Sequence, residues 1–425
     1  MELKTLTPRT RIRRSAVRDI LAFHNRPDMI SLAGGLPDPD SLPVAGIARS
    51  AQYVLSRYGG IALQYGTTEG FHPLREYIAS MISRNGLKTA PEQILITSGS
   101  QQAMDLVGRY LLTSGQVFTT EPMYNGAVQS FELQGATIHS LACDEMGPTV
   151  EALRKIPKYS KGIPEESDAG PAFRGGFRSL SVPSGSRASA EKEGQTRILY
   201  LLPTLGNPTG AIIPEGRRQE IRKILQDSDQ WLLEEDPYGD LIFDGSRLPY
   251  LSQGSETRSL LLGSFSKTVS PSLRIGWLRA SEEEIQEIVP LKQAMDLHTN
   301  LLSQMILHRF LEDVDLDLHL SRLRQIYRQR MEAALGYLWD ANLPLQPETV
   351  PVGGMFLWIK TDVDTDALGR AGLEEGVAIV PGSAFFSRAE EGKRHFRINF
   401  SAVSVEEIRQ GMERLVRAYH RIRGS

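Results

Sequence analysis

Short apolar runs alternate with helical patterns along the chain between about residues 46 and 305. Strands that are separated by helices form βαβ units, and such units build a parallel sheet that helices cover on both faces. The pattern therefore predicts an α/β large domain around a mostly parallel mixed sheet flanked by helices. The runs that we predict to be strands are 93–97, 116–120, 136–140, 197–202, 231–235 and 259–262.

The pattern changes from about residue 306. A long, highly charged helical pattern over 301–341 leads into an apolar strand at 353–359, and a last helix is predicted over 404–421. This order of elements is typical of an α+β unit. At 425 residues the chain is long enough for two or three units. We predict an N-terminal arm that also contributes to the small domain (1–45), a large domain (46–305) and a small C-terminal domain (306–425).

One segment breaks the alternation. Residues 159–196 are rich in Gly, Ser, Pro, Glu and Arg and show almost no apolar periodicity. A structureless stretch of this length is unusual inside a compact domain, and loops lie on the surface by default. We therefore predict an exposed, flexible insertion, with a lid over a substrate site as the alternative.

Composition and charge exclude several classes of protein. The hydrophobic fraction of 40% and the charged fraction of 23% are typical of a globular protein with a sizeable core. The net charge of −3 gives no basis for binding nucleic acid or an anionic membrane surface. No apolar run approaches the roughly 18 residues of a membrane span, and the first residues lack the apolar core of a signal peptide. Cys143 is the only cysteine, so we expect a reducing, cytoplasmic location, and the eight scattered histidines predict no metal site.

The segment Ser264-Phe265-Ser266-Lys267, followed by Arg274, carries the strongest chemical signal. A lysine amine attacks carbonyl groups, whereas two hydroxyls and a guanidinium bind an anion. Serines at i and i+2 face the same side of an extended segment, as a shared anion requires. Together these groups match a phosphorylated aldehyde, and pyridoxal 5′-phosphate (PLP) carries both functions on one ring. Taken alone, the segment is a weak signal, because most lysines are solvated surface residues.

Polar side chains also follow two predicted strands. Asn207 follows one of them, and Asp236 and Tyr238 follow the next. Ligands bind beyond the carboxyl ends of strands in an open α/β sheet, so these residues should open into one crevice. If 236–238 stays extended, Asp236 and Tyr238 point to the same side. Asp236 would then pair with a protonated pyridine nitrogen, and Asn207 and Tyr238 would hydrogen-bond the phenolic oxygen of the ring.

A turn at Gly99 separates the strand at 93–97 from an amphipathic helix that begins near Ser100 and Gln101. Unpaired N–H groups and the positive end of the helix dipole make such a start an anion site. An ordinary helix cap, in which Ser100 satisfies the free helix donors, is the alternative. The serines and the arginine described above favour the anion site.

These motifs, in this order, resemble those of the fold-type I PLP-dependent aminotransferases of class I/II, and the 2-aminoadipate/kynurenine type is the most similar. The resemblance covers nearly the whole chain, from the motif at 30–37 to the motif at 396–401. It implies PLP as the cofactor, held as an imine on Lys267. The phosphate shell that it implies consists of Ser100, Gln101, Ser264, Ser266 and Arg274.

The resemblance also assigns residues to the ring and to the neighbouring subunit. Tyr124, which follows the strand at 116–120, would stack on one face of the pyridine ring, with simple rim packing as the alternative. Tyr65 resembles the tyrosine that reaches the phosphate bound by the partner subunit. A homodimer with shared active sites is therefore implied.

Substrate-binding residues follow from the same resemblance. Arg397 matches the position that binds the substrate α-carboxylate as a bidentate fork, for which a planar guanidinium is well suited. Gly35 would let the backbone approach the substrate, and Asn207 would lie beside it. Arg18 aligns loosely with a mobile arm and would favour acidic substrate side chains. A surface arginine with no specific role is the alternative for both arginines.

The chemistry that the resemblance implies is transamination. Lys267 would move a proton between the substrate α-carbon and the cofactor, and Asp236 would keep the ring nitrogen protonated. We therefore predict a transaminase that exchanges an amino group between an L-amino acid and a 2-oxo acid by ping-pong chemistry. Glutamate and 2-oxoglutarate are expected as one pair.

Other functions share some of these residues. A C–S β-lyase or a decarboxylase would keep Lys267 and Asp236, so these residues do not exclude either activity. A transcription regulator needs a DNA-binding domain of roughly 70 residues or more before the enzyme portion. The motif at 30–37 begins early, and we disfavour that reading. The stretch Thr204-Leu205-Gly206 departs from the aromatic–Gln pair of close relatives, which leaves the substrate open.

Overall fold

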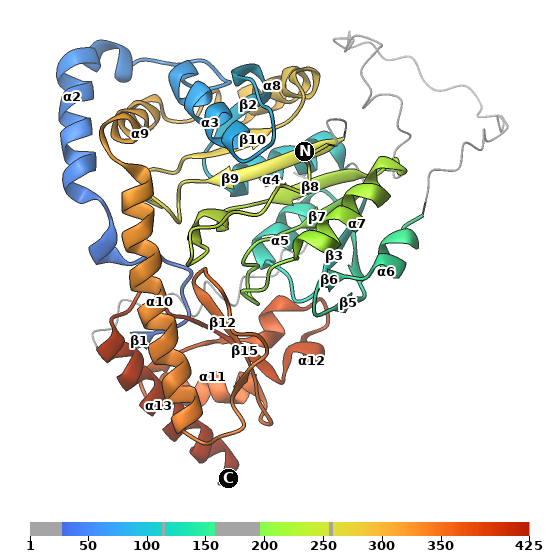
Figure 1. The fold of residues 1–425 in the computed structure, drawn as a ribbon, viewed down its shortest axis with the longest axis vertical. Coiled ribbons are helices and arrows are strands. Elements are labelled where there is room, and N and C mark those ends of the chain that lie inside the picture. The colour runs from blue at the N-terminus through green and yellow to red at the C-terminus, as the bar shows by residue number, and fades with distance from the viewer. Residues whose placement is uncertain (1–27, 113–114, 158–195, 255–257, 425) are drawn as a thin grey trace, which may run out of the picture.

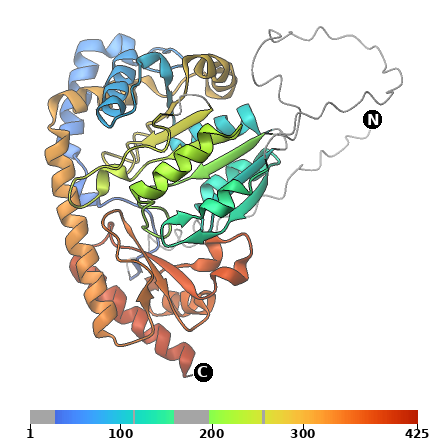
Figure 2. The same cartoon turned by 45° about the vertical axis from the view of Figure 1, so that its right-hand side comes forward.

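The computed structural model of the protein describes residues 28–112, 115–157, 196–254 and 258–424. A seven-stranded sheet lies at the centre of the large domain, and a smaller unit lies beside it (Figures 1 and 2). The strand order across the sheet is β2 (Ile94–Thr97), β10 (Gly276–Arg279), β9 (Ser259–Ser264), β8 (Trp231–Glu235), β7 (Arg197–Leu201), β3 (Gln116–Thr120) and β4 (Thr137–Leu141).

The sheet is mostly parallel, as predicted. β10 runs antiparallel to both of its neighbours, and the pairs from β9 across to β4 are parallel. Every predicted strand forms, with small shifts at the ends. β10 was not predicted, because a strand of four residues gives too short an apolar run to be recognised.

Each face of the sheet is buried by its own helices. Leu233 and Leu262 on one face belong to a core shared with α4 (Ser100–Leu111), α5 (Asn125–Leu133) and α8 (Glu282–Asp296). Leu232 and Leu261 lie on the other face, in cores shared with α3 (His72–Arg84), α6 (Val150–Arg154) and α7 (Glu215–Gln226). The central strands are therefore apolar on both faces, as strands of a covered parallel sheet are.

The smaller unit is the predicted α+β domain. Its antiparallel sheet has the order β11 (Gln346–Pro347), β12 (Phe356–Lys360), β15 (His395–Asn399) and β14 (Val380–Pro381). The N-terminal segment joins it, because β1 (Ile30–Ser31) pairs with β13 (Val377–Ala378). The helices that complete it are α11 (Thr365–Glu374) and α13 (Val405–Arg423), the latter capped by Ser404.

Short elements connect these parts. They are η2 (Pro39–Ser41), η3 (Pro91–Gln93), β5 (Cys143–Asp144), β6 (Gly147–Pro148), η5 (Gly239–Leu241), η6 (Gly382–Phe385) and α12 (Ala389–Gly392). Within the described ranges, no helix has the length and apolar character that crossing a bilayer requires. The same ranges contain no cluster of side chains suited to holding a metal ion.

The predicted single helix over 301–341 is wrong, because two helices occupy this stretch. α9 (Leu301–Asp313) ends before Val314, whose backbone is extended. α10 (Leu316–Asp340) begins after Asp315, whose carboxylate accepts a hydrogen bond from the Leu318 N–H at 2.9 Å. The break lets α9 pack on α2 (Val44–Ala62), while α10 continues into the smaller unit (Figure 1). The predicted domain boundary at 306 lies inside α9 and stays a prediction.

Replacing Asp315 with Ala should lower the free energy of unfolding by about 1 kcal/mol, because the first N–H groups of α10 lose their side-chain acceptor. Asp317→Ala is the matched control, since Asp317 lies in the same turn but is not the cap. It should cost about 0.5 kcal/mol through the helix dipole. Urea unfolding midpoints measure both effects. An Asp315→Ala midpoint equal to that of the wild type would show that the cap does not stabilise α10.

Candidate active site

Lys267 lies in the loop between β9 and β10. Its Nζ donates a hydrogen bond to the Gly35 carbonyl oxygen at 2.6 Å. Burial lowers the pKa of Lys267 to about 8, and the positive charges of Arg397 and Arg274 add to the shift. More of this lysine is therefore neutral near physiological pH than of an exposed one, and the neutral amine is the nucleophile.

The anion-binding groups predicted around Lys267 lie together. Ser264 Oγ donates to Ser266 Oγ at 2.9 Å, and the Ser266 N–H donates to Ser264 Oγ at 3.1 Å. Arg274 donates to Ser266 Oγ at 3.5 Å and to the Ser98 carbonyl oxygen at 3.0 Å. The two hydroxyls and the guanidinium thus share one location, next to the start of α4.

Two glycines permit this close approach. Gly99 has a φ of +83°, and a Cβ there would lie 2.4 Å from an Arg274 guanidinium nitrogen. A Cβ on Gly276 would lie 2.5 Å from the Gly99 carbonyl carbon and 2.7 Å from the Ser100 nitrogen. The absence of both side chains brings the N-terminus of α4 beside Arg274, where free N–H groups and the helix dipole favour an anion.

Tyr124 and Gln101 link the starts of α5 and α4. Tyr124 is the residue that precedes α5, and its hydroxyl donates to Gln101 Oε1 at 3.4 Å. Gln101 Nε2 donates to the Gly126 carbonyl oxygen at 3.0 Å and to Ser130 Oγ at 2.6 Å. Stacking of Tyr124 on a bound ring, and contact of Gln101 with phosphate, stay predictions.

Arg397 is only 2% exposed and bridges the two parts of the chain. Its Nη1 donates to Asn207 Oδ1 and its Nη2 to the Ala33 carbonyl oxygen, both at 2.6 Å. The guanidinium lies 4.3 Å from the centre of the Phe356 ring. Its buried Nε has no hydrogen-bond partner among the described residues. A desolvated guanidinium with a spare donor is suited to a carboxylate ligand.

Tyr238 joins Arg397 and Asn207, as predicted for one crevice. Burial raises the pKa of Tyr238, while the Arg397 charge and a hydrogen bond with the Asn207 side chain oppose that rise. The Tyr238 ring packs edge-on against Phe356, with centroids 5.9 Å apart.

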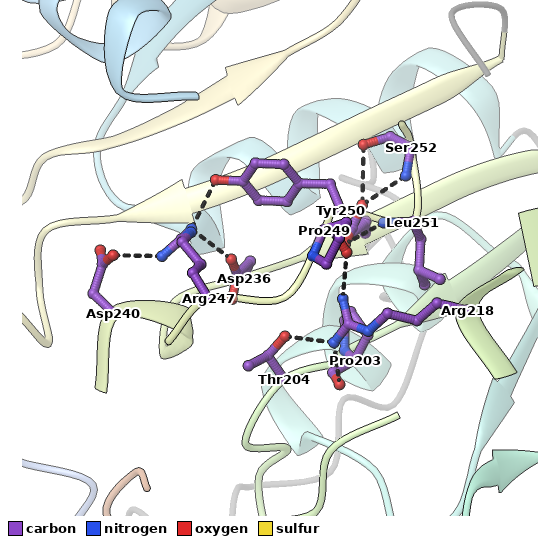
Figure 3. A network of polar contacts seen from close by, with 11 residues as sticks. Pro203, Thr204, Arg218, Asp236, Asp240, Arg247, Pro249, Tyr250, Leu251 and Ser252 are labelled. Carbon is purple, nitrogen blue, oxygen red and sulfur yellow. Dashed lines mark hydrogen bonds and ion pairs between the residues drawn. The ribbon is translucent and has the colours of Figure 1, made fainter. Parts of the chain in front are cut away.

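Asp236 does not join this group. Its Oδ2 accepts a hydrogen bond from Arg247 at 2.7 Å, and Arg247 also binds Asp240 and the Tyr250 hydroxyl (Figure 3). The assumption that 236–238 stays extended is wrong, because Tyr238 has φ −119° and ψ −5° and precedes η5. Arg247 takes Oδ2, while the buried Oδ1 of Asp236 has no hydrogen-bond partner among the described residues. The predicted pairing of Asp236 with a ring nitrogen stays a prediction.

Glu235 is the carboxylate that faces the site from β8, and it was not among the predicted site residues. The Tyr200 hydroxyl donates to Glu235 Oε2 at 2.6 Å. Burial raises the pKa of Glu235, whereas hydrogen bonds with Tyr200 and Ser100 and the charge of Lys267 lower it. Alternation along the strand explains the difference, because Glu235 shares the α4 side with Leu233 and Asp236 lies on the opposite side.

Arg218 of α7 holds the loop that carries Asn207. Its buried guanidinium donates to Thr204 Oγ1 at 2.7 Å and to the carbonyl oxygens of Pro203 and Pro249, both at 2.8 Å (Figure 3). It also donates to the Ile213 carbonyl oxygen at 2.7 Å. Leu205, which follows Thr204, has a φ of +54° and packs in the core of the smaller unit. Within the unusual stretch 204–206, Gly206 alone lines the cavity described next.

A cavity of about 570 Å³ opens beside Tyr124 and Asn207. It lies between loops at the ends of β3 and β7 and the strands β11 and β12 of the smaller unit. Glu121, Trp358 and Lys360 are among its lining residues. Its position next to Asn207 makes it a candidate space for a substrate side chain.

Arg18 and nearly all of the predicted insertion at 159–196 lie outside the described residues. Tyr65 follows α2, is 76% exposed, and packs edge-on against the His298 ring at a centroid distance of 5.8 Å. Its contact with a neighbouring subunit stays a prediction.

Known proteins match this chain along most of its length. The sequence model described as aminotransferase class I and II matches residues 27–415. The 2-aminoadipate transaminase of Thermus thermophilus is 35% identical over 416 residues, which cover 96% of this chain and 94% of that protein. The aromatic-amino-acid aminotransferase 1 of Thermococcus litoralis is 34% identical over 407 residues, with 94% and 90% covered.

A solved structure agrees with these sequence matches. It is the α-aminoadipate aminotransferase LysN from Thermus thermophilus, complexed with N-(5′-phosphopyridoxyl)-L-leucine. The TM-score is 0.81 at 33% identity, with 97% of this chain and 96% of that chain covered. The chain therefore belongs to the aminotransferase class I and II family. Its fold is fold type I, its cofactor is PLP, and the predictions of family, fold class and cofactor are confirmed.

The residues of the site fit PLP. Ser264, Ser266, Arg274 and the N-terminus of α4 offer donors to a phosphate, and Lys267 offers an amine to the aldehyde. The unpartnered Nε of Arg397 offers a donor to a substrate carboxylate. Which residue contacts which atom stays a proposal.

The rate of covalent PLP attachment to the apoenzyme should rise as the pH passes through about 8, because only neutral Lys267 reacts. An unshifted lysine would place this rise near pH ~10.4. Stopped-flow absorbance measures the rate. Arg397→Gln removes a nearby positive charge and should move the midpoint upward, whereas the charge-conserving Arg397→Lys should move it less. A wild-type midpoint near 10 would contradict the lowered pKa.

Proposed function

We propose that this transaminase moves the amino group of an L-amino acid to a 2-oxo acid by ping-pong chemistry, with glutamate and 2-oxoglutarate as one pair. The observation that carries the proposal is the proximity of Lys267 to Arg397. Lys267 Nζ donates to the Gly35 carbonyl oxygen and Arg397 Nη2 to that of Ala33, two residues away in the same segment. At this distance the Arg397 charge lowers the pKa of Lys267. A carboxylate bound by Arg397 would thus hold the neighbouring α-carbon near the lysine amine.

Each residue has a defined task in this proposal. Arg397 binds the α-carboxylate, and Asn207 and the Ala33 carbonyl oxygen keep the guanidinium in place. Lys267, with its amine free and neutral, would take the proton from the substrate α-carbon and hold it for return. PLP, when bound, supplies the aldehyde that takes up the amino group and the ring that accepts electron density from the α-carbon. Ser264, Ser266, Arg274 and Ser100 would anchor its phosphate, and Tyr124 would lie against its ring.

The relatives support the choice of substrate class. One is named for 2-aminoadipate and another for aromatic amino acids, so both kinds of donor belong in the first panel. The cavity of about 570 Å³ beside Asn207 has room for side chains of either kind. We further propose a cytoplasmic location, which a single cysteine in 425 residues favours.

A homodimer is part of the proposal. α2 and the residues just after it expose large apolar side chains, including Ile61 at 62%, Leu63 at 71% and Tyr65 at 76%. Contiguous exposed apolar surface marks interaction sites in soluble proteins. A second copy seated on this surface would bring Tyr65 to the phosphate bound by its partner.

Stoichiometric enzyme mixed with an amino donor, without any 2-oxo acid, should convert its PLP to the pyridoxamine form once and then stop. Added 2-oxoglutarate should restore the original spectrum. Arg397→Lys should lower kcat/KM by a factor of about 10 to 100, because a bidentate charge-assisted pair is worth about 1.5–3 kcal/mol. Arg409→Lys on exposed α13 is the control. Repeated turnover of the donor without an acceptor would instead indicate a lyase or a decarboxylase.

Two inactive variants should complement each other if Tyr65 serves the partner's site. Lys267→Ala and Tyr65→Ala are each expected to be strongly impaired. When the two are mixed and allowed to exchange subunits, each hybrid dimer contains one intact site, so activity should return to roughly a quarter of the wild-type value. No recovery in a mixture whose hybrid dimers are verified by native mass spectrometry would refute the shared site.

A further inference from the structure

The turn that leads into α4 is held from behind by a side chain. Gly99, the residue that precedes α4, gives no side-chain hydrogen bond to the first turn of the helix. Gln102, in that first turn, reaches back instead, and its Oε1 accepts a hydrogen bond from the Ser98 N–H at 2.7 Å. This bond fixes the turn without using any of the first N–H groups of α4, which are the donors that an anion needs.

Ser98 is held through both of its backbone groups. Its N–H donates to Gln102, and its carbonyl oxygen accepts a hydrogen bond from Arg274 Nη2 at 3.0 Å. Arg274 also donates to Ser266 Oγ at 3.5 Å. Ser98 therefore connects the Gln102 side chain to the guanidinium that we expect at the cofactor phosphate.

A buried ion pair on α8 holds Gln102 in turn. Lys292 is fully buried, and its Nζ lies 2.8 Å and 3.0 Å from the two carboxylate oxygens of Asp296. The same Nζ donates to Gln102 Oε1 at 3.2 Å, and Gln102 Nε2 donates to Asp296 Oδ2 at 2.6 Å. A charged group thus binds each end of the amide, and such charge-assisted hydrogen bonds fix its orientation.

Packing alone does not explain this ion pair. Lys292 lies four residues after Ile288 and seven after Ile285, so all three share one face of α8. Both isoleucines belong to the apolar core that α8 shares with α4 and the sheet. An apolar residue at position 292 would continue this face, and replacing a buried ion pair with apolar residues is often neutral or stabilising. The contact with Gln102 gives the two charges a role that an apolar residue could not have.

We propose that Gln102, Lys292 and Asp296 are positioning residues for the cofactor phosphate. They act through Ser98 and hold the Arg274 guanidinium and the N-terminus of α4 at one fixed spacing. A site that is fixed before its ligand arrives binds more tightly, because less ordering is needed on binding. The inference rests on the proposed function, because it takes the phosphate to lie between Arg274 and the start of α4.

The test compares PLP with pyridoxal, which has the same ring and aldehyde but no phosphate. Titration of the apoenzyme gives a dissociation constant for each compound, and their ratio measures what the phosphate contributes. Gln102→Met keeps a side chain of similar length but removes the acceptor of the Ser98 N–H. We expect it to weaken PLP binding about tenfold, the upper end for the loss of one hydrogen bond, and to change pyridoxal binding by less than about twofold.

Two further variants separate positioning from general stability. Lys292→Met combined with Asp296→Leu removes both charges together, so that neither stays buried and unpaired. Because the Ser98 bond remains, this variant should weaken PLP binding by only about threefold, again without affecting pyridoxal. Tyr110→Phe is the matched control, since the Tyr110 hydroxyl also joins α4 to α8, donating to Glu287 at 2.6 Å near the other end of α4. It should leave the ratio at the wild-type value.

Equal losses of PLP and pyridoxal binding in Gln102→Met, or an unchanged ratio, would overturn the inference. If Gln102→Met does not fold, the same two outcomes are decisive in the variant without the ion pair. Arg274→Met checks the phosphate site itself and should also lower the preference for PLP. A wild-type protein that binds PLP no more tightly than pyridoxal, or an unchanged ratio in Arg274→Met, would contradict the proposed phosphate site instead.

Discussion

The buried guanidinium of Arg397 is the interaction on which the site depends. It belongs to β15 of the smaller unit, yet it donates to Asn207 in the large domain and to Ala33 in the N-terminal segment. A desolvated positive charge is unfavourable by itself, and burial lowers the pKa of Arg397 to about 10. The guanidinium remains charged at neutral pH, and one of its buried donors has no partner in the described part of the chain. Arg397 thus joins the two parts of the chain and still has a positive charge and a free donor that a substrate carboxylate can pair with.

A second set of buried charges supports the loops around this site from the far side of the sheet. Arg218 donates hydrogen bonds to carbonyl oxygens of the segments before and after α7. Arg247 forms ion pairs with Asp236 and Asp240. Such pairs contribute little net stability compared with apolar packing, but they fix geometry. The reactive groups need not hold the loops themselves, so they stay available for ligands.

The alternating pattern was enough to predict the sheet, because strands buried on both faces give continuous apolar runs. The cluster of Lys267, Ser264, Ser266 and Arg274 was also predictable, because short loops keep neighbours in sequence close in space. The side to which Asp236 points could not be predicted from the sequence. A strand covered on both faces gives no sequence signal for which face holds α4, so Glu235 and Asp236 are equivalent until the helices are placed. The break between α9 and α10 could not be predicted from the sequence either. The apolar periodicity continues across Val314, and the only signal is a single capping residue, Asp315.

The reversed direction of β10 has a consequence for how such a protein can diversify. The chain leaves the sheet at the end of β9 and re-enters it through β10, so Lys267 and Arg274 both sit on a single hairpin anchored by paired backbone at each side. The paired backbone of this hairpin therefore sets the distance between the Lys267 amine and the anion site at Arg274. The cavity wall comes instead from distant loops and from β11 and β12. Substitutions in that wall can therefore change substrate specificity without moving Lys267 and Arg274, so that cofactor binding is kept.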